Sequence, residues 1–134
     1  MIINEVFAHP TLGEQEWIEL RNTTTSTLTV RHWRLHRTSD QLTKAYTLPE
    51  MTLPPAGLGV VFLEDGFLPN QGGTVQLWDA HDQPVGTALT YPLVVLQQAY
   101  ARTADGSWTT DYPPSPGHPN RPASAPSPTL TQTA

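Results

Sequence analysis

Cysteine is absent from this sequence of 134 residues, which excludes disulfide bonds, thiolate metal ligands and cysteine nucleophiles. The length predicts one domain, and a chain of this size buries enough surface to fold without covalent cross-links. Cysteine-free proteins occur in reducing and in oxidising compartments, so this absence is compatible with either.

Basic residues are scarce: seven Lys and Arg stand against twelve Asp and Glu, and the net charge is −5. Nucleic-acid binders usually carry a basic excess because phosphate contacts supply most of their affinity, so the composition disfavours that class. No run of 18 apolar residues occurs, and we predict no membrane span. Met1 is followed at once by a strand-like segment rather than a signal peptide. If the protein is exported, we therefore expect this sequence to be a mature or excised piece of it.

Catalytic and metal-binding motifs are also missing. The sequence has no Gly-x-Ser-x-Gly, P-loop or Gly-x-Gly-x-x-Gly, and no serine has a triad-like context. His32 and His36 would lie about 13 Å apart on an extended strand, too far for one metal ion. The turn Asp79–Asp82 lacks the dense acidic ligands of a tuned calcium loop. We predict no enzymatic activity, no cofactor and no bound metal.

Strand signals dominate what is present, and no segment carries a helical stripe of useful length. Short runs of Val, Ile, Thr and aromatic residues alternate with Gly, Pro, Asn and Asp, at a spacing typical of β-sandwiches. This pattern predicts an all-β sandwich of about seven to nine strands. The predicted strands are 2–7, 16–21, 28–37, 45–48, 59–63, 74–79, 85–91 and 99–103. The apolar run 93–96 is read as a strand or a buried loop, and Gly72 and Gly73 as backbone freedom before a strand.

Composition shifts after Asn120. We predict a domain over residues 1–120, followed by a tail or linker over 121–134 that is rich in Pro, Ser, Thr and Ala. An extended segment of this kind can dock into a groove of a neighbouring subunit. This motivates a hypothesis of self-assembly through the tail and through strand edges, including the Thr-rich segment 23–29.

The stretch GEQEWIELRN, residues 13–22, gathers three carboxylates around a tryptophan and raises the question of an acid/base pair. Strand alternation places Glu16 with Ile18 and puts Trp17 with Glu19 on the opposite face. Two acids on opposite faces cannot converge on one substrate, so we interpret them as solvated or hydrogen-bonded strand carboxylates. A bulge near Trp17, which would turn Trp17 and Ile18 both inward, is the alternative.

The segment RHWRLHR is the one basic cluster, and alternation places His32, Arg34 and His36 on one face. It predicts either an anion-binding patch or an exposed face paired with acids of a neighbouring strand, and the acidic composition favours the second. Trp33 and Trp78 are predicted to pack in or near the core, whereas Trp108 lies in a predicted loop where it covers an edge or forms a contact. The candidate interaction residues are Arg31, His32, Arg34, His36, Arg37 and Trp108.

Five motifs in order resemble the lamin tail domain family. IINEVF followed by EWIELRN is similar to the family's first two strands, LTVRHWRLHR to its Leu-x-Gly-Trp-x-Leu strand, and YTLPEMTLPPAGLGVVF to its proline-punctuated segment. LPNQGGTVQLW and the closing ARTADGSW with PPSPGHPN complete the series, which spans residues 2–120. His32 stands where the family has glycine. The residues that match the family pattern and are expected to be structural are Asn4, Glu5, Glu16, Trp17, Glu19, Asn22, Trp33, Gly72 and Gly73.

The resemblance implies an immunoglobulin-like β-sandwich without catalytic function. Bacterial members accompany secreted or surface proteins, often beside nucleases or other hydrolases. We therefore expect an extracellular or cell-surface structural module that contacts proteins, copies of itself included, and could form a filament. A nucleic-acid-binding module using Arg21, Arg31, Arg34 and Arg37, or an accessory domain of a secreted hydrolase, is the alternative.

Overall fold

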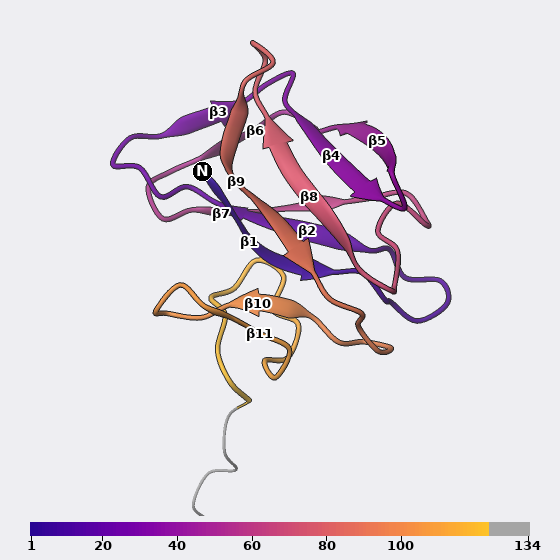
Figure 1. Cartoon of the computed structure of the whole chain (residues 1–134). Coiled ribbons are helices and arrows are strands. Elements are labelled where there is room, and N and C mark those ends of the chain that lie inside the picture. Colours follow the sequence, from indigo (N-terminus) through magenta and orange to yellow (C-terminus); the bar gives the residue numbers. More distant parts are fainter. Residues whose placement is uncertain (124–134) are drawn as a thin grey trace, which may run out of the picture.

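The computed structural model describes residues 1–123, whose regular elements are all β-strands (Figure 1). Eleven strands occur in this part of the chain, and every strand pair is antiparallel. The largest sheet has five strands in the order β11 (Trp108–Thr109), β10 (Tyr100–Arg102), β1 (Ile2–Phe7), β2 (Trp17–Arg21) and β7 (Leu58–Phe62).

A second sheet of four strands lies across the first (Figure 1). A short pair of strands accompanies the two sheets. The four-stranded sheet has the order β5 (Leu42–Thr47), β4 (Arg34–Ser39), β8 (Gly73–Trp78) and β9 (Pro84–Tyr91), and the pair consists of β3 (Leu28–Val30) and β6 (Met51–Leu53). The prediction of an all-β, sandwich-like domain is confirmed.

The main core lies between the two sheets and is built by strand alternation. Ile18 and Leu20 of β2 point into it from one side, and Leu35, Val75 and Leu77 of β4 and β8 meet them from the other. All five side chains are fully or almost fully buried. Since a buried Leu, Ile or Val contributes roughly 1.5–3 kcal/mol, these positions supply much of the driving force for folding.

The strand count exceeds the predicted seven to nine because three features escaped the sequence pattern. The predicted strand 28–37 is interrupted at His32, whose φ is +59°, a left-handed conformation that a regular strand cannot contain. The short strands β6 and β11 lie in segments that were predicted to be loops. The run 93–96 is a loop in which Val94 is buried while its neighbours are exposed.

The strand β5 begins earlier than predicted because a tight turn precedes it. Asp40 and Gln41 both have positive φ, +50° and +64°, and Ser39 pairs with Leu42 across them. Two left-handed residues between paired strands form a type I′ hairpin turn, which normally prefers Asn-Gly. The segment SDQLTK therefore holds a two-residue turn and the start of a strand.

Gly72 has a positive φ, which is the backbone freedom that was predicted for a glycine before this strand. Its φ is +108°, and a Cβ atom there would approach the carbonyl oxygen of Tyr91 to 2.7 Å. Both the backbone angle and the space thus require glycine before β8. Gly73 begins β8 itself.

The predicted tail lies largely outside the described residues. Its first three residues, 121–123, are exposed and have no regular structure, and the hypothesis of tail docking concerns residues 124–134. Within residues 1–123 no helix is long and apolar enough to cross a membrane.

Candidate interaction surface

The basic cluster RHWRLHR does not form one patch. Arg37 shares the inward face of β4 with Leu35 and is only 5% exposed. Its Nε donates to the carbonyl oxygen of Phe67 at 2.7 Å, and its guanidinium carbon lies 5.6 Å from the Phe67 ring centroid. Arg37 is therefore a structural residue, contrary to its predicted place on an interaction surface.

The exposed arginines of the cluster have acidic partners. Arg31 pairs with Glu50 at 2.9 Å, and Arg34 pairs with Asp82 of the β8–β9 turn. This arrangement agrees with the interpretation of an exposed face paired with neighbouring acids. Exposed pairs of this kind contribute little to stability, but they neutralise charge that an anion patch would need.

The two histidines of the cluster do not share a face with one another. His32 lies in the turn before β4, so the strand alternation that would align it with Arg34 does not reach it. His36 stacks on Trp78, with ring centroids 5.1 Å apart. Burial and, to a smaller extent, Arg34 lower the pKa of His36, which favours the neutral ring at neutral pH.

Trp108 lies in the short edge strand β11 and packs on the neighbouring strand β10 rather than protruding. Its ring stacks on Tyr100 at 4.9 Å between centroids, and the guanidinium carbon of Arg102 lies 4.7 Å from its centroid. Trp108 is half-buried in this stack. The predicted loop is therefore a strand at this position, and Trp108 is part of the sheet edge.

Trp33 packs against the core, as predicted, whereas Trp78 lies on the face of β8 opposite the core residues Val75 and Leu77 and stacks on His36, contrary to its prediction. Both are half-buried, and Trp33 lies against the main core cluster. The indole Nε1 of Trp78 is buried and has no hydrogen-bond partner among the described residues.

Trp17 lies on the face of β2 opposite Ile18, but that face is buried. The register between β2 and β7 is regular from Trp17 to Arg21, so no bulge lies in β2. The irregularity occurs in β1 instead, between Ile3 and Glu5. Trp17 stacks on Phe7 in a second apolar cluster, with ring centroids 5.3 Å apart. The expectation of polar surroundings for Trp17 was therefore wrong.

Three carboxylates on or beside the first two strands are buried. Of the two interpretations of Glu16 and Glu19, solvated or hydrogen-bonded, the hydrogen-bonded one is observed. Glu5 and Glu19 have no exposed surface and Glu16 is 4% exposed. The sequence gives no sign of what covers them, because the covering residues lie far along the chain.

The segment Ser115–Asn120 covers Glu5 and Glu19, which are cross-strand neighbours. Ser115 donates its backbone N–H and its hydroxyl to the two oxygens of Glu5, at 3.0 and 2.9 Å. Gly117 donates its N–H to Glu19 at 2.7 Å, and Asn4 donates its amide to the other oxygen at 3.0 Å. Like charges directly opposite each other normally destabilise a sheet, and these donors compensate part of that cost.

Asn120 fastens this segment to the sheet. Its side-chain amide donates to the carbonyl oxygens of Asn4 in β1 and Arg102 in β10, at 2.8 and 2.9 Å. Its Oδ1 lies 3.2 Å from the Ser115 hydroxyl oxygen, so it and Glu5 are alternative acceptors of the one hydroxyl proton. We call residues Ser115–Asn120 the carboxylate clasp. In Figure 1 it belongs to the yellow part of the chain, beside β10 and β11.

Glu16 plays a comparable part at the opposite end of β2. Its carboxylate accepts from the backbone N–H of Leu68, and the N–H groups of Gly66 and Phe67 also point toward it. Its backbone oxygen accepts from Leu63 at 2.9 Å. Glu16 thus organises the loop after β7.

Burial dominates the ionisation of these acids. It raises the pKa of Glu5 and of Glu16 to about 7, although backbone N–H donors act in the opposite direction in both cases. The pKa of Glu19 is also raised by burial. A perturbed pKa can mark a catalytic group or a buried structural carboxylate, and each of these carboxylates accepts hydrogen bonds from backbone N–H groups.

Asn22 is the remaining polar residue buried in this region. Its amide donates to the carbonyl oxygens of Ser26 and Leu53 at 2.8 and 3.0 Å, and its Oδ1 accepts from the Thr24 N–H at 2.9 Å. It shapes the exposed Thr-rich segment 23–29, whose last residues enter β3. Asn4, Glu5, Glu16, Glu19 and Asn22 thus all serve as buried hydrogen-bonding residues.

The turn Asp79–Asp82 is held by hydrogen bonds from backbone N–H groups to the Asp79 side chain. The Asp79 carboxylate accepts the N–H groups of His81 and Gln83, at 2.8 and 3.0 Å. Within the described part of the chain, no three His, Asp or Glu side chains gather closely enough to hold a metal ion.

The strand β5 is the most open regular element. It pairs with β4 along six residues, and its other edge has no partner strand in residues 1–123. Five of its six residues are exposed, and Leu42 is 67% exposed. The edge strand β9, by contrast, has an irregular register and lies against β1. The sequence predicts a strand only over 45–48 and edge contacts in segment 23–29 and the tail, so the open edge of β5 was not predicted.

No protein-family model, no curated protein and no solved structure matches this chain.

Proposed function

We propose that this protein is a non-catalytic interaction module of the lamin-tail type, with an immunoglobulin-like arrangement of its two sheets. Support comes from the residues that carry the resemblance. Asn4, Glu5, Glu19 and Asn22 all lie buried in hydrogen-bond networks that join distant segments, which is a structural use of the shared pattern.

The proposed mode of action is strand addition at β5, with a second copy of the chain as the partner. An open edge offers unpaired N–H and C=O groups to another strand, and main-chain hydrogen bonds then supply affinity. The regular pairing of all six residues of β5 with β4, and the exposure of five of them, are the observation that carries this proposal. We further propose an extracellular or cell-surface location in a bacterium. Pairing of β5 with β5 of a second copy closes a two-fold dimer, so a filament would require a second contact surface in addition to β5.

Light scattering and electron microscopy over a range of protein concentrations test this mode. We expect wild-type protein to associate, and Ala45→Lys in β5 to weaken association because an edge lysine opposes strand pairing. Ala88→Lys is the matched control, since it places the same charge at an exposed position of the other edge strand, β9. If wild-type protein is monomeric at all concentrations, or if both variants lose association equally, the β5 edge is not the contact surface.

Nucleic-acid binding is the weaker alternative. Of its four proposed arginines, Arg37 is buried and two others have acidic partners. A gel-shift assay at low salt would show binding if this alternative held. The further alternative, an accessory domain of a secreted hydrolase, is tested by the coding sequence beside this segment.

A further inference from the structure

A cleft of about 400 Å³ opens at one end of the five-stranded sheet, between the sheet and the clasp. Polar and apolar residues both line it. The lining residues are Asn4, Arg21, Ala56, Leu58, Arg102, Thr103, Ala104, Gly106, Pro119 and Asn120.

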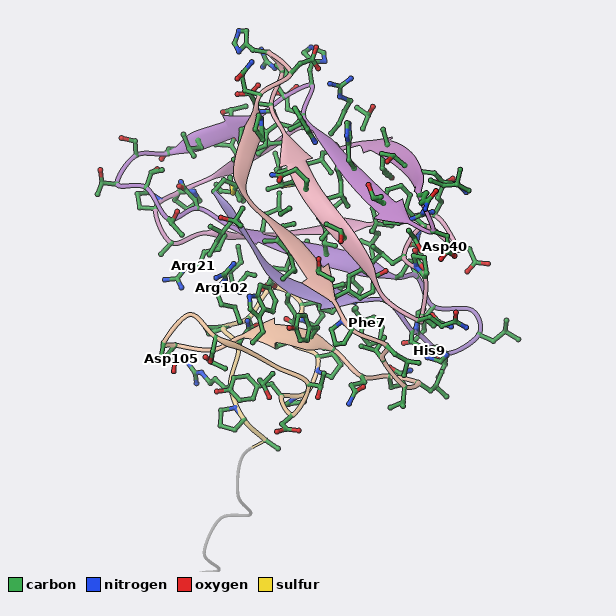
Figure 2. The ribbon with its side chains drawn as sticks, in the orientation of Figure 1. Phe7, His9, Arg21, Asp40, Arg102 and Asp105 are labelled. Atoms are coloured by element: carbon green, nitrogen blue, oxygen red, sulfur yellow. The ribbon has the colours of Figure 1, made fainter. Side chains whose placement is uncertain are left out.

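Two guanidinium groups face this cleft from different strands. Arg21 ends β2 and is exposed, while Arg102 ends β10 and is half-buried (Figure 2). No Asp or Glu lines the cleft, and neither arginine forms a salt bridge within residues 1–123. This is unusual in a chain whose acids outnumber its Lys and Arg by twelve to seven.

Arg102 is held in a fixed orientation. Its Nε and Nη2 donate to the carbonyl oxygen of Ile3, at 3.3 and 3.1 Å, and its guanidinium lies over the Trp108 ring. A guanidinium has five N–H donors, so most of its donors are left without a protein acceptor. Burial alone lowers the pKa of Arg102, which reflects a desolvated charge without a counter-ion.

The acids nearest in sequence are occupied elsewhere. Asp105 stands between lining residues, but its carboxylate accepts hydrogen bonds from Ser107 and Thr103 within its own turn. Figure 2 shows Asp105 apart from the two neighbouring arginines. Glu19 precedes Arg21 by two residues, and its carboxylate is enclosed by Asn4 and Gly117.

We propose that this cleft binds a carboxylate carried on a short apolar arm, as in a glutamate or aspartate side chain of a protein partner. Guanidinium groups bind carboxylates through paired, charge-assisted hydrogen bonds, and the orientation of Arg102 reduces the entropy lost on binding. Leu58, Ala104 and Pro119 supply an apolar wall for the methylene groups. The choice of a protein carboxylate rests on the proposed interaction role.

Nuclear magnetic resonance titration of the ¹⁵N-labelled protein tests this site, with N-acetyl-glutamate amide as the probe and constant ionic strength. We expect saturable shifts at the amides of Arg21, Arg102 and Gly106. N-acetyl-glutamine amide, which is uncharged and of similar shape, should give none. A glutamate-containing blocked peptide should bind at the same amides and at least as tightly as free glutarate, whereas clearly tighter binding of free glutarate would overturn a protein carboxylate as the ligand.

The matched variants are Arg21→Gln and Arg31→Gln, because both remove one exposed arginine. Arg21→Gln should weaken binding about tenfold, as expected for loss of one charge-assisted contact, while Arg31→Gln should leave it unchanged. Equal affinity in the two variants, no saturable shift with the glutamate probe, or saturation by phosphate alone would overturn the inference. These titrations use monomeric protein at low concentration, so their failure is distinguishable from failure of the β5 edge.

Discussion

At the residue scale, the buried acids make stability depend on pH in an unusual direction. The pKa of Glu5 and of Glu16 is raised from 4.5 to about 7 on folding. Between these values the native state binds more protons than the unfolded state, so stability should fall as pH rises from about 4.5 to about 7. Urea unfolding between pH 4 and 8, with about 1–3 kcal/mol of lost stability per group as the expected scale, measures this. A stability that rises with pH across this window would contradict it.

Glutamine substitutions should separate Glu5 from Glu19. The Ser115 hydroxyl can accept from an amide at position 5 and donate to Asn120, so Glu5→Gln should change stability little at pH 7 and reduce the pH dependence. Both oxygens of Glu19 face groups that can only donate, the Asn4 side-chain NH₂ and the Gly117 N–H. The NH₂ group of a glutamine at position 19 would therefore face one of these donors. Glu19→Gln should cost about 1–3 kcal/mol. Equal effects of the two substitutions in chemical denaturation would refute this distinction.

At the element scale, strand alternation predicted most of the sandwich, and the failures have local causes. Ile18 and Leu20, two positions apart in the predicted strand 16–21, share one face and both lie in the core. The break at His32 and the turn at Asp40 and Gln41 were not predicted, because non-glycine residues seldom adopt positive φ.

The burial of the second face of the five-stranded sheet could not be predicted from the strands themselves. Glu5 contacts Ser115, 110 positions along the chain, and Glu19 contacts Gly117, 98 positions along. A period-two pattern shows which residues share a face, but it does not show what covers that face. The Arg21–Arg102 cleft was missed for the same reason, since its arginines come from strands that only the sheet topology brings together.

The β4–β5 turn offers a stabilising substitution. Gln41 has a φ of +64° in a type I′ turn, so Gln41→Gly should raise the free energy of unfolding by about 0.5–1 kcal/mol. Gln97 has a similar φ of +66°, but its side chain donates to Thr11 and Glu14. Gln97→Gly should therefore show a smaller gain or a loss. Thermal melts of both variants test this. A destabilised Gln41→Gly variant would contradict the inference that the positive φ of Gln41 strains the backbone.

At the scale of the whole molecule, the clasp joins the end of the domain to its first two strands. Ser115 and Gly117 supply the donors, and Asn120 ties the segment to β1 and β10. Because the clasp also forms one wall of the proposed carboxylate site through Pro119 and Asn120, folding of the sheet and formation of the cleft are coupled.

Two truncated chains, one ending at Asn120 and one ending at Pro114, isolate the contribution of the clasp. The shorter chain should be less stable by about 3 kcal/mol or more, because it loses several hydrogen bonds to buried charged groups. Without the clasp, Glu5 also becomes accessible to water, and its pKa should return toward 4.5. The shorter chain should therefore lose part of the fall in stability between pH 4.5 and 7, and only the contribution of Glu16 should persist. Parallel urea titrations of both chains across this pH range measure the two effects together. Equal stability of the chains, or an unchanged pH dependence in the shorter one, would show that the clasp does not govern the burial of Glu5.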